Sequence, residues 1–109
     1  MVSYFIRYRG SATDPDAFLD YYRVHHAAIL QRFPQIKSLV LNTPVAVTDP
    51  FPVRPAGSAL LAQMFFDNTA ALNAALQSQA RKDARDDFAL FPSFAGEITH
   101  EALKCEVVF

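Results

Sequence analysis

The stretch DPDAFLDYYRVHHAAILQRF, from Asp14 to Phe33, predicts one long amphipathic helix with a histidine on its buried face. Asp14 is a favourable N-cap residue, and Pro15 suits the first helical position, where no backbone N–H is needed. Pro34 cannot continue a helix and disfavours helical geometry at the residue before it. The expected helix therefore ends at Phe33.

The apolar side chains of this helix fall on one contiguous stripe when successive residues are placed at about 100° intervals. His26 lies inside the stripe, His25 lies at its edge, and Tyr21 lies further out. A titratable imidazole in such a stripe either hydrogen-bonds a buried backbone carbonyl or acts on a ligand. The apolar members of the stripe are Phe18, Leu19, Tyr22, Ile29, Leu30 and Phe33.

The composition limits the class of protein. A chain of 109 residues with a hydrophobic fraction of 51% predicts a single domain, over residues 1–109, with a real core. A net charge of −1, with basic and acidic residues spread along the chain, leaves no electrostatic footprint for nucleic acid. No apolar run reaches the roughly 18 residues that span a membrane, and the N-terminal residues lack signal-peptide features. The single cysteine, Cys105, fits a reducing compartment, so we expect a cytoplasmic protein.

The rest of the chain predicts the element order β-α-β, loop, β-α-β. In one sheet this order gives an α+β, ferredoxin-like βαββαβ fold, with an antiparallel four-stranded sheet and the helices on one face. A turn is expected at residues 10–13, and the proline-rich segment 49–57 is expected to be a loop able to close over a pocket. The expected strands cover residues 2–9, 36–43, 58–66 and 97–105, and the later helices cover 69–78 and a charged stretch that ends at Pro92.

The expected strands carry large apolar side chains on both faces. Val40 faces away from Leu39 and Leu41, and Phe65 faces away from Met64. Because the helices cover only one face of the sheet, the other face needs a cover of its own. A homodimer with two sheets packed face to face supplies that cover, so the sequence predicts a dimeric α+β barrel.

The segment from Phe18 to Ile29 resembles the first helix of the EthD family. Members of this family show an aromatic residue, then tryptophan or tyrosine, arginine, and a tail like histidine-alanine-proline-leucine. This chain departs from the pattern at Ala28, where the family has proline, and at Gln35, where it has glycine. The residues that match are Tyr22, Arg23, His26, Ala27 and Ile29.

The second half of the chain is also similar to this family. Phe65-Phe66-Asp67-Asn68 resembles the family's aromatic-aspartate-serine entry into a helix, and Asp87 and Phe91 resemble its aspartate-x-x-x-phenylalanine motif. The resemblance covers nearly the whole chain and implies a dimeric α+β barrel. Barrels of this kind include muconolactone-type isomerases, polyketide cyclases and quinol-forming monooxygenases, so the fold alone does not choose a reaction.

His26 is the leading candidate for a catalytic residue, because burial would keep its imidazole neutral and able to accept a proton. Asp87 could hold the other ring nitrogen as a second catalytic residue, although the run RKDARDD is also typical of a solvated helix face. No spacing of cysteine, histidine and carboxylate residues suggests a metal site, and no cofactor is expected. The side chains expected to bind substrate are Tyr4, Tyr22, Met64, Phe66, Phe88 and Phe91.

The sequence therefore predicts an EthD-like protein that acts on a small hydrophobic molecule, either aromatic or carbonyl-containing. The expected chemistry is cofactor-free acid/base catalysis, such as isomerisation or cyclisation. Two alternatives stay open: a non-catalytic ligand-binding protein that assists a degradation enzyme, and a metal-free quinol-type monooxygenase. The expected partners are a second copy of the chain and the small molecule, with no nucleic acid and no membrane.

Overall fold

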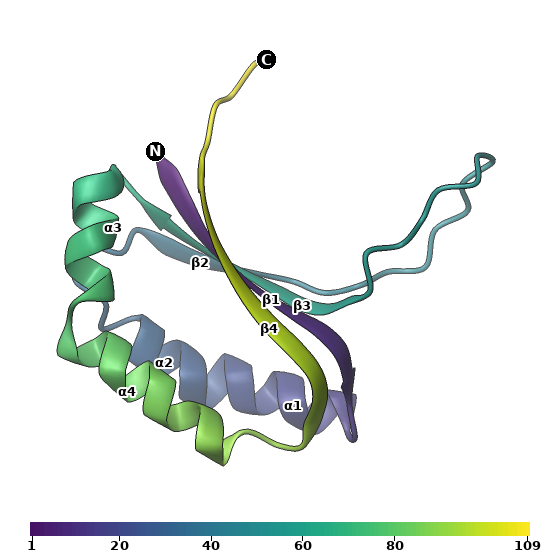
Figure 1. The fold of residues 1–109 in the computed structure, drawn as a ribbon, viewed down its shortest axis with the longest axis horizontal. Coiled ribbons are helices and arrows are strands. Elements are labelled where there is room, and N and C mark those ends of the chain that lie inside the picture. Colours follow the sequence, from purple (N-terminus) through teal and green to yellow (C-terminus); the bar gives the residue numbers. More distant parts are fainter.

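The computed structural model describes residues 1–109 as a four-stranded antiparallel sheet with helices on one face (Figure 1). The strand order β2-β3-β1-β4 is that of the ferredoxin-like fold, so the predicted α+β fold class is confirmed. None of the helices is long and apolar enough to cross a membrane. The strands are β1 (Val2–Ala12), β2 (Ser38–Asn42), β3 (Ser58–Phe66) and β4 (Phe94–Lys104). The helices are α1 (Pro15–Tyr21), the π-helix η1 (Tyr22–His26), α2 (Ala27–Leu30), α3 (Thr69–Leu76), α4 (Gln79–Asp87) and the 3₁₀-helix η2 (Phe88–Leu90).

The first helical segment follows the sequence prediction at its start but not at its end. The Asp14 carboxylate accepts a hydrogen bond from the backbone N–H of Ala17, which caps α1 as expected. Helical structure stops at Leu30 rather than at Phe33, because the N–H of Phe33 bonds the carbonyl of Leu30 in a tighter turn. Gln35 follows with φ at 62°, in the left-handed region that favours glycine, the residue the family pattern has here.

β1 is longer than the sequence predicts. The turn expected at residues 10–13 is wrong, because β1 continues to Ala12 and pairs with β4 as far as Phe94. Gly10 and Gly96 stand opposite each other in this ladder with φ at 137° and 150°. A Cβ atom on either glycine would overlap the backbone of the facing strand. The two glycines therefore allow a close approach of two long strands rather than a turn.

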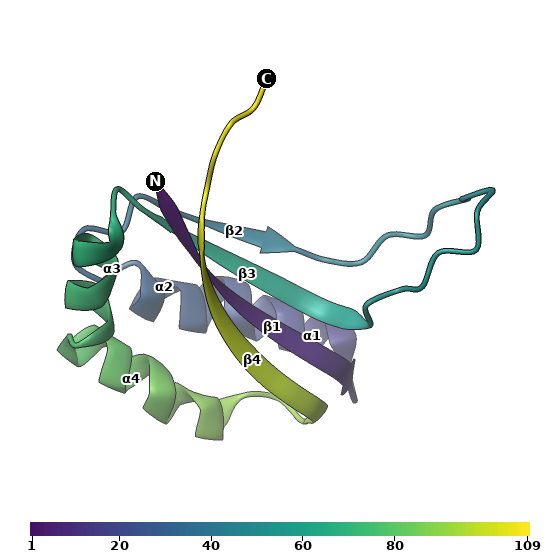
Figure 2. The ribbon, with the colours of Figure 1, turned by 45° about the horizontal axis from the view of Figure 1, so that its top comes forward.

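The core lies between the sheet and the helices, which all lie on the same side of the sheet (Figure 2). Residues alternate along β3, where Met64 and Phe66 face the helices and Phe65 faces away. Phe18, Tyr22, Leu30 and Phe33 contribute the buried side chains of the first helical segment. The opposite sheet face carries a second apolar group, as predicted, which consists of Phe5, Val40, Leu61, Phe65 and Leu103.

Residues 43–57 join β2 to β3 as an extended arm without helix or strand (Figure 1). Residues 49–57 are a loop, as predicted, and the arm projects away from the helices; that the loop can close over a pocket stays a prediction. β2 ends at Asn42, just before Pro44, which cannot donate a ladder hydrogen bond. The exposed apolar side chains of the arm are Val45, Val47, Phe51 and Val53.

Candidate functional site

A buried histidine–carboxylate pair joins the first helical segment to α4. Nδ1 of His26 lies 2.8 Å from Oδ2 of Asp87, and the two side chains are almost fully buried. Because a carboxylate only accepts hydrogen bonds, the ring nitrogen that faces it carries the proton and donates it. In the neutral ring this leaves Nε2 unprotonated, with its lone pair free.

The π-helical turn η1 positions His26. The backbone N–H of Ala27 bonds the carbonyl of Tyr22, five residues earlier, so this turn contains one residue more than an α-helical turn. Tyr22 and His26 are both buried, and their ring centroids lie 4.8 Å apart. Turns of this kind inside α-helices are frequent at functional sites.

Tyr21 completes the surroundings of Asp87. Its hydroxyl donates a 2.7 Å hydrogen bond to Oδ1 of Asp87, and this bond raises the pKa of Tyr21 to about 12. Each carboxylate oxygen of Asp87 thus accepts one hydrogen bond, which offsets the cost of its burial. Sequence reasoning does not assign Tyr21 to the site, because a contact across 66 residues leaves no local pattern.

Burial sets the protonation state of His26. It lowers the pKa of His26 below the ordinary value of 6.5, although the hydrogen bond and the charge of Asp87 act in the opposite direction. The imidazole is therefore neutral at pH 7, with Nδ1 protonated toward Asp87. A neutral ring held in this tautomer is suited to act as a general base through Nε2.

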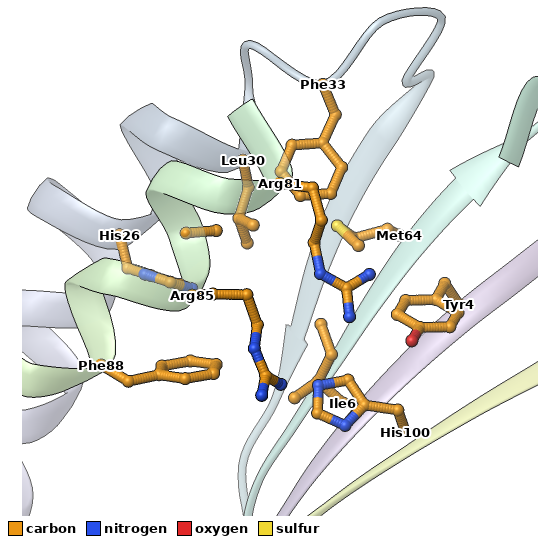
Figure 3. Close-up of a pocket in the computed structure, with 11 residues that line it drawn as sticks. Tyr4, Ile6, His26, Leu30, Phe33, Met64, Arg81, Arg85, Phe88 and His100 are labelled. Atoms are coloured by element: carbon orange, nitrogen blue, oxygen red, sulfur yellow. The ribbon is translucent and has the colours of Figure 1, made fainter. Parts of the chain in front are cut away.

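Four of the predicted site residues meet in one place. His26, Tyr4, Met64 and Phe88 line a hollow between α4 and the sheet, which we call the His26 hollow (Figure 3). Ile6, Leu30 and Phe33 add to its apolar wall. Its free space is about 20 Å³, enough for about one water-sized group with the side chains in these positions. A larger ligand therefore needs the side chains at the mouth to move.

The mouth of the His26 hollow carries three residues that the sequence does not single out. Arg81 and Arg85 come from α4, and His100 comes from β4 (Figure 3). The two arginines belong to the charged run that predicts a solvated helix face, but their spacing of four residues places both on one side of α4. That side also carries Ala84 and Phe88, and it faces the hollow.

The other predicted substrate-binding residues lie beside the hollow and do not line it. Phe66 is fully buried in the core. Tyr22 packs against the His26 ring, and Phe91 meets that ring edge-on with 4.8 Å between centroids. Tyr22 and Phe91 can hold the imidazole in place, while a ligand in the hollow would contact Tyr4, Met64 and Phe88.

The hydroxyl groups of Tyr8 and Tyr22 are buried without a hydrogen-bond partner in the chain. Burial raises the pKa of both phenols far above neutral pH, so both stay protonated. Their rings form part of an aromatic cluster that packs against His26 through Tyr22 and Phe91. This cluster supports the site by packing and adds no charge to it.

The remaining histidine, cysteine and carboxylate residues are dispersed. No group of three or more of them could hold a metal ion. His25, next to His26, is exposed, and its ring packs against that of Tyr21 at a tilt of 32° with 4.9 Å between ring centroids. The expectation that the protein needs neither metal nor cofactor stays a prediction.

The fold and the site define a class of small ferredoxin-like α+β proteins, with an apolar hollow between helices and sheet and a buried histidine in its wall. The chain belongs to the EthD family, because the EthD domain model matches its residues 11–93. The resemblance seen in the sequence is thereby confirmed.

Solved structures share this fold at low sequence identity. An ethyl tert-butyl ether D (EthD) family protein from Bacillus halodurans is 18% identical, with a TM-score of 0.73 over 97% of this chain and 100% of that one. SnoaB, a cofactor-independent oxygenase from Streptomyces nogalater, is 14% identical, with a TM-score of 0.63 over 98% of this chain and 94% of that one. A dimeric ferredoxin-like protein of unknown function from Thermobifida fusca is 10% identical, with a TM-score of 0.60 over 95% of this chain and 90% of that one. No curated protein matches the sequence.

The lowered pKa of His26 makes the stability of the fold depend on pH. Below pH 6.5 the unfolded chain protonates this histidine and the folded chain does not, so the free energy of unfolding falls on acidification and rises with pH. One such proton contributes up to about 1.4 kcal/mol per pH unit. We expect His26→Gln, whose amide can still donate a hydrogen bond to Asp87, to lose this part of the pH dependence of the unfolding free energy, measured by urea unfolding from pH 6.5 downward.

His25→Gln is the matched control, because it removes an exposed imidazole from the adjacent position. It should keep the wild-type dependence of the unfolding free energy on pH. The lowered pKa of His100 contributes equally to all three proteins and cancels in the comparison. Equal slopes for the wild type and His26→Gln would contradict a buried, neutral His26.

Proposed function

We propose that this protein binds a small hydrophobic, carbonyl-containing molecule in the His26 hollow and moves a proton on it without a cofactor. One observation carries the proposal: His26 stands in the wall of a largely apolar hollow, and the buried Asp87 behind it hydrogen-bonds its ring. The pair fixes the tautomer of the ring, and burial keeps the ring neutral. A neutral imidazole with a free Nε2 is a base for carbon acids near neutral pH.

The reaction follows from these positions. Nε2 of His26 accepts a proton from a carbon next to the carbonyl, and the C–H electron pair forms an enolate with its charge on the carbonyl oxygen. Asp87, held by Tyr21, stabilises the imidazolium that results. The imidazolium then returns the proton to a different atom of the substrate. The product is an isomer or a cyclised form, and no oxidant or reductant is consumed.

A metal-free oxygenase is the second candidate function. The fold is shared with SnoaB, a cofactor-independent oxygenase. The same base would remove a proton from a phenolic substrate, and the electron-rich anion would then react with O₂. Consumption of O₂ by a phenolic substrate with the wild-type protein would favour this candidate over isomerisation.

The proton-transfer proposal predicts that the protein accelerates carbon–hydrogen exchange in a simple aromatic ketone. β-Tetralone has acidic hydrogens next to its carbonyl, and ¹H NMR in D₂O follows their replacement by deuterium. We expect the wild-type protein to exchange them faster than buffer. We expect His26→Gln to remove about 10²- to 10⁴-fold of that acceleration, the usual contribution of a positioned base.

His25→Gln serves as the control for the exchange assay and should match the wild type, because His25 is exposed. Saturation-transfer NMR with the same ketone reports binding independently of exchange. Binding without accelerated exchange would contradict catalysis and favour a ligand-carrying accessory protein. Absence of both would contradict the proposed ligand class.

We also propose that two copies of the chain pack through the sheet faces that carry no helices. On this face Val40, in the middle of β2, and Leu103, near the end of β4, are 41% and 46% exposed, which leaves apolar surface uncovered. The arm and the C-terminal residues also project away from the helices and expose apolar side chains (Figure 2). A structure with the same fold, from Thermobifida fusca, is described as dimeric.

The dimer proposal predicts a solution mass of twice the chain mass of 12.2 kDa by size-exclusion chromatography with light scattering. Leu61→Glu places a charge on the free sheet face, opposite Arg7 in β1, and should give a monomer. Val24→Glu is the control, because Val24 is 64% exposed on the helical side. A monomeric wild-type protein at micromolar concentration would contradict the proposal.

A further inference from the structure

Two arginines of α4 lie at the mouth of the His26 hollow, Arg81 half-buried and Arg85 exposed to solvent. Figure 3 shows Arg81 and Arg85 with their guanidinium groups directed toward the mouth of the His26 hollow. Arg81 lies over the ring of Tyr4, with Cζ 5.7 Å from its centroid. Arg85 lies over the ring of Phe88, with Cζ 5.6 Å from its centroid. The aromatic rings thus hold both charges at the same opening.

Neither of these guanidinium groups is paired with a carboxylate. Other arginines of the chain are paired: Arg9 with Glu97, Arg23 with Asp20, and Arg32 with Asp83. Of the three acidic residues of α4, Asp83 bonds Arg32, Asp87 bonds His26, and the exposed Asp86 forms no ion pair, so none of them neutralises Arg81 or Arg85. The two charges are therefore available to a group from outside the chain.

His100 adds an uncharged polar group to the same opening. It lies at the mouth with Arg81 and Arg85 (Figure 3). Burial lowers the pKa of His100 first, and the charges of Arg81 and Arg85 lower it further. His100 is thus a neutral hydrogen-bonding group at the same opening as the two cations. No acidic residue lines the hollow.

We propose that the ligand carries a carboxylate, which Arg81 and Arg85 bind at the mouth of the His26 hollow. The apolar part of the ligand then enters toward Leu30 and Met64, and its reacting carbon comes to His26. This inference rests on the proposed function and names the substrate class of that site: hydrophobic, carbonyl-containing carboxylic acids. Long arginine side chains can move aside to admit the ligand and then close over its charged end.

The lining of the hollow favours a carboxylate over a phosphate ester. A carboxylate is planar with one negative charge, and two guanidinium groups satisfy both of its oxygens. A phosphate has a third oxygen and additional charge, which need further donors. The remaining wall is apolar and consists of side chains such as Ile6, Met64 and Phe88. It offers no loop of backbone N–H groups for a phosphate.

Three probes that share a naphthalene ring test the inference: 2-naphthoate, its neutral amide 2-naphthamide, and 2-naphthyl phosphate. Dissociation constants come from NMR titrations that follow the ring resonances of His26 and His100. We expect the wild type to bind the carboxylate at least roughly tenfold more tightly than the amide, as charge-assisted hydrogen bonds predict. The double variant Arg81→Gln/Arg85→Gln should bind both with similar affinity.

Lys82→Gln is the matched control, because it removes one positive charge from the same helix at an exposed position that does not line the hollow. It should keep the preference for the carboxylate. Equal binding of naphthoate and naphthamide by the wild type would overturn this inference while leaving the proposed function intact, provided that the amide shifts the His26 resonances. Tighter binding of the naphthyl phosphate would overturn the choice of a carboxylate. Binding of none of the probes would count against the inference and the proposed function together.

Discussion

The hydrogen bond between His26 and Asp87 is the constraint on which the rest of the site depends. It joins two helical segments through residues that are 61 positions apart in the chain, and it stabilises a carboxylate in a place where an unpaired charge would be costly. Tyr21 binds the second oxygen of that carboxylate. The orientation of the imidazole, its tautomer and the free Nε2 in the wall of the hollow all follow from this one contact.

The His26 hollow has two chemically different ends. Its inner part is apolar and holds a neutral base, while its mouth holds the guanidinium groups of Arg81 and Arg85. A molecule with an acidic end and an apolar body would enter in one direction only, because its charge is stabilised at the mouth and would be costly near Met64. The fold would then set the position of the ligand and the protonation state of His26 before any reaction begins.

Local sequence patterns predict most of the helices and strands. The features that they do not predict depend on contacts between elements that are far apart in the chain. The strand at residues 58–66 has the predicted bounds, because a short, nearly continuous apolar run between Gly57 and the helix cap at Asn68 defines it locally. Gly10 indicates a turn in isolation, but it faces Gly96 across two strands, which no local pattern reveals. His26 can be found from the sequence because it is a titratable residue in an apolar helical stripe, and Asp87 because it matches a family motif. Arg81 has no such signal, since it looks like any charged residue on a solvated helix face.

The tautomer of His26 tests the central claim most directly. Long-range ¹H–¹⁵N correlation spectra of protein labelled with ¹⁵N-histidine distinguish the three forms of an imidazole ring, and His26→Gln assigns the signal. At pH 7 we predict a neutral His26 with the proton on Nδ1 and an unprotonated Nε2. A proton on Nε2, or a doubly protonated ring at that pH, would contradict the account of His26 as a base held by Asp87.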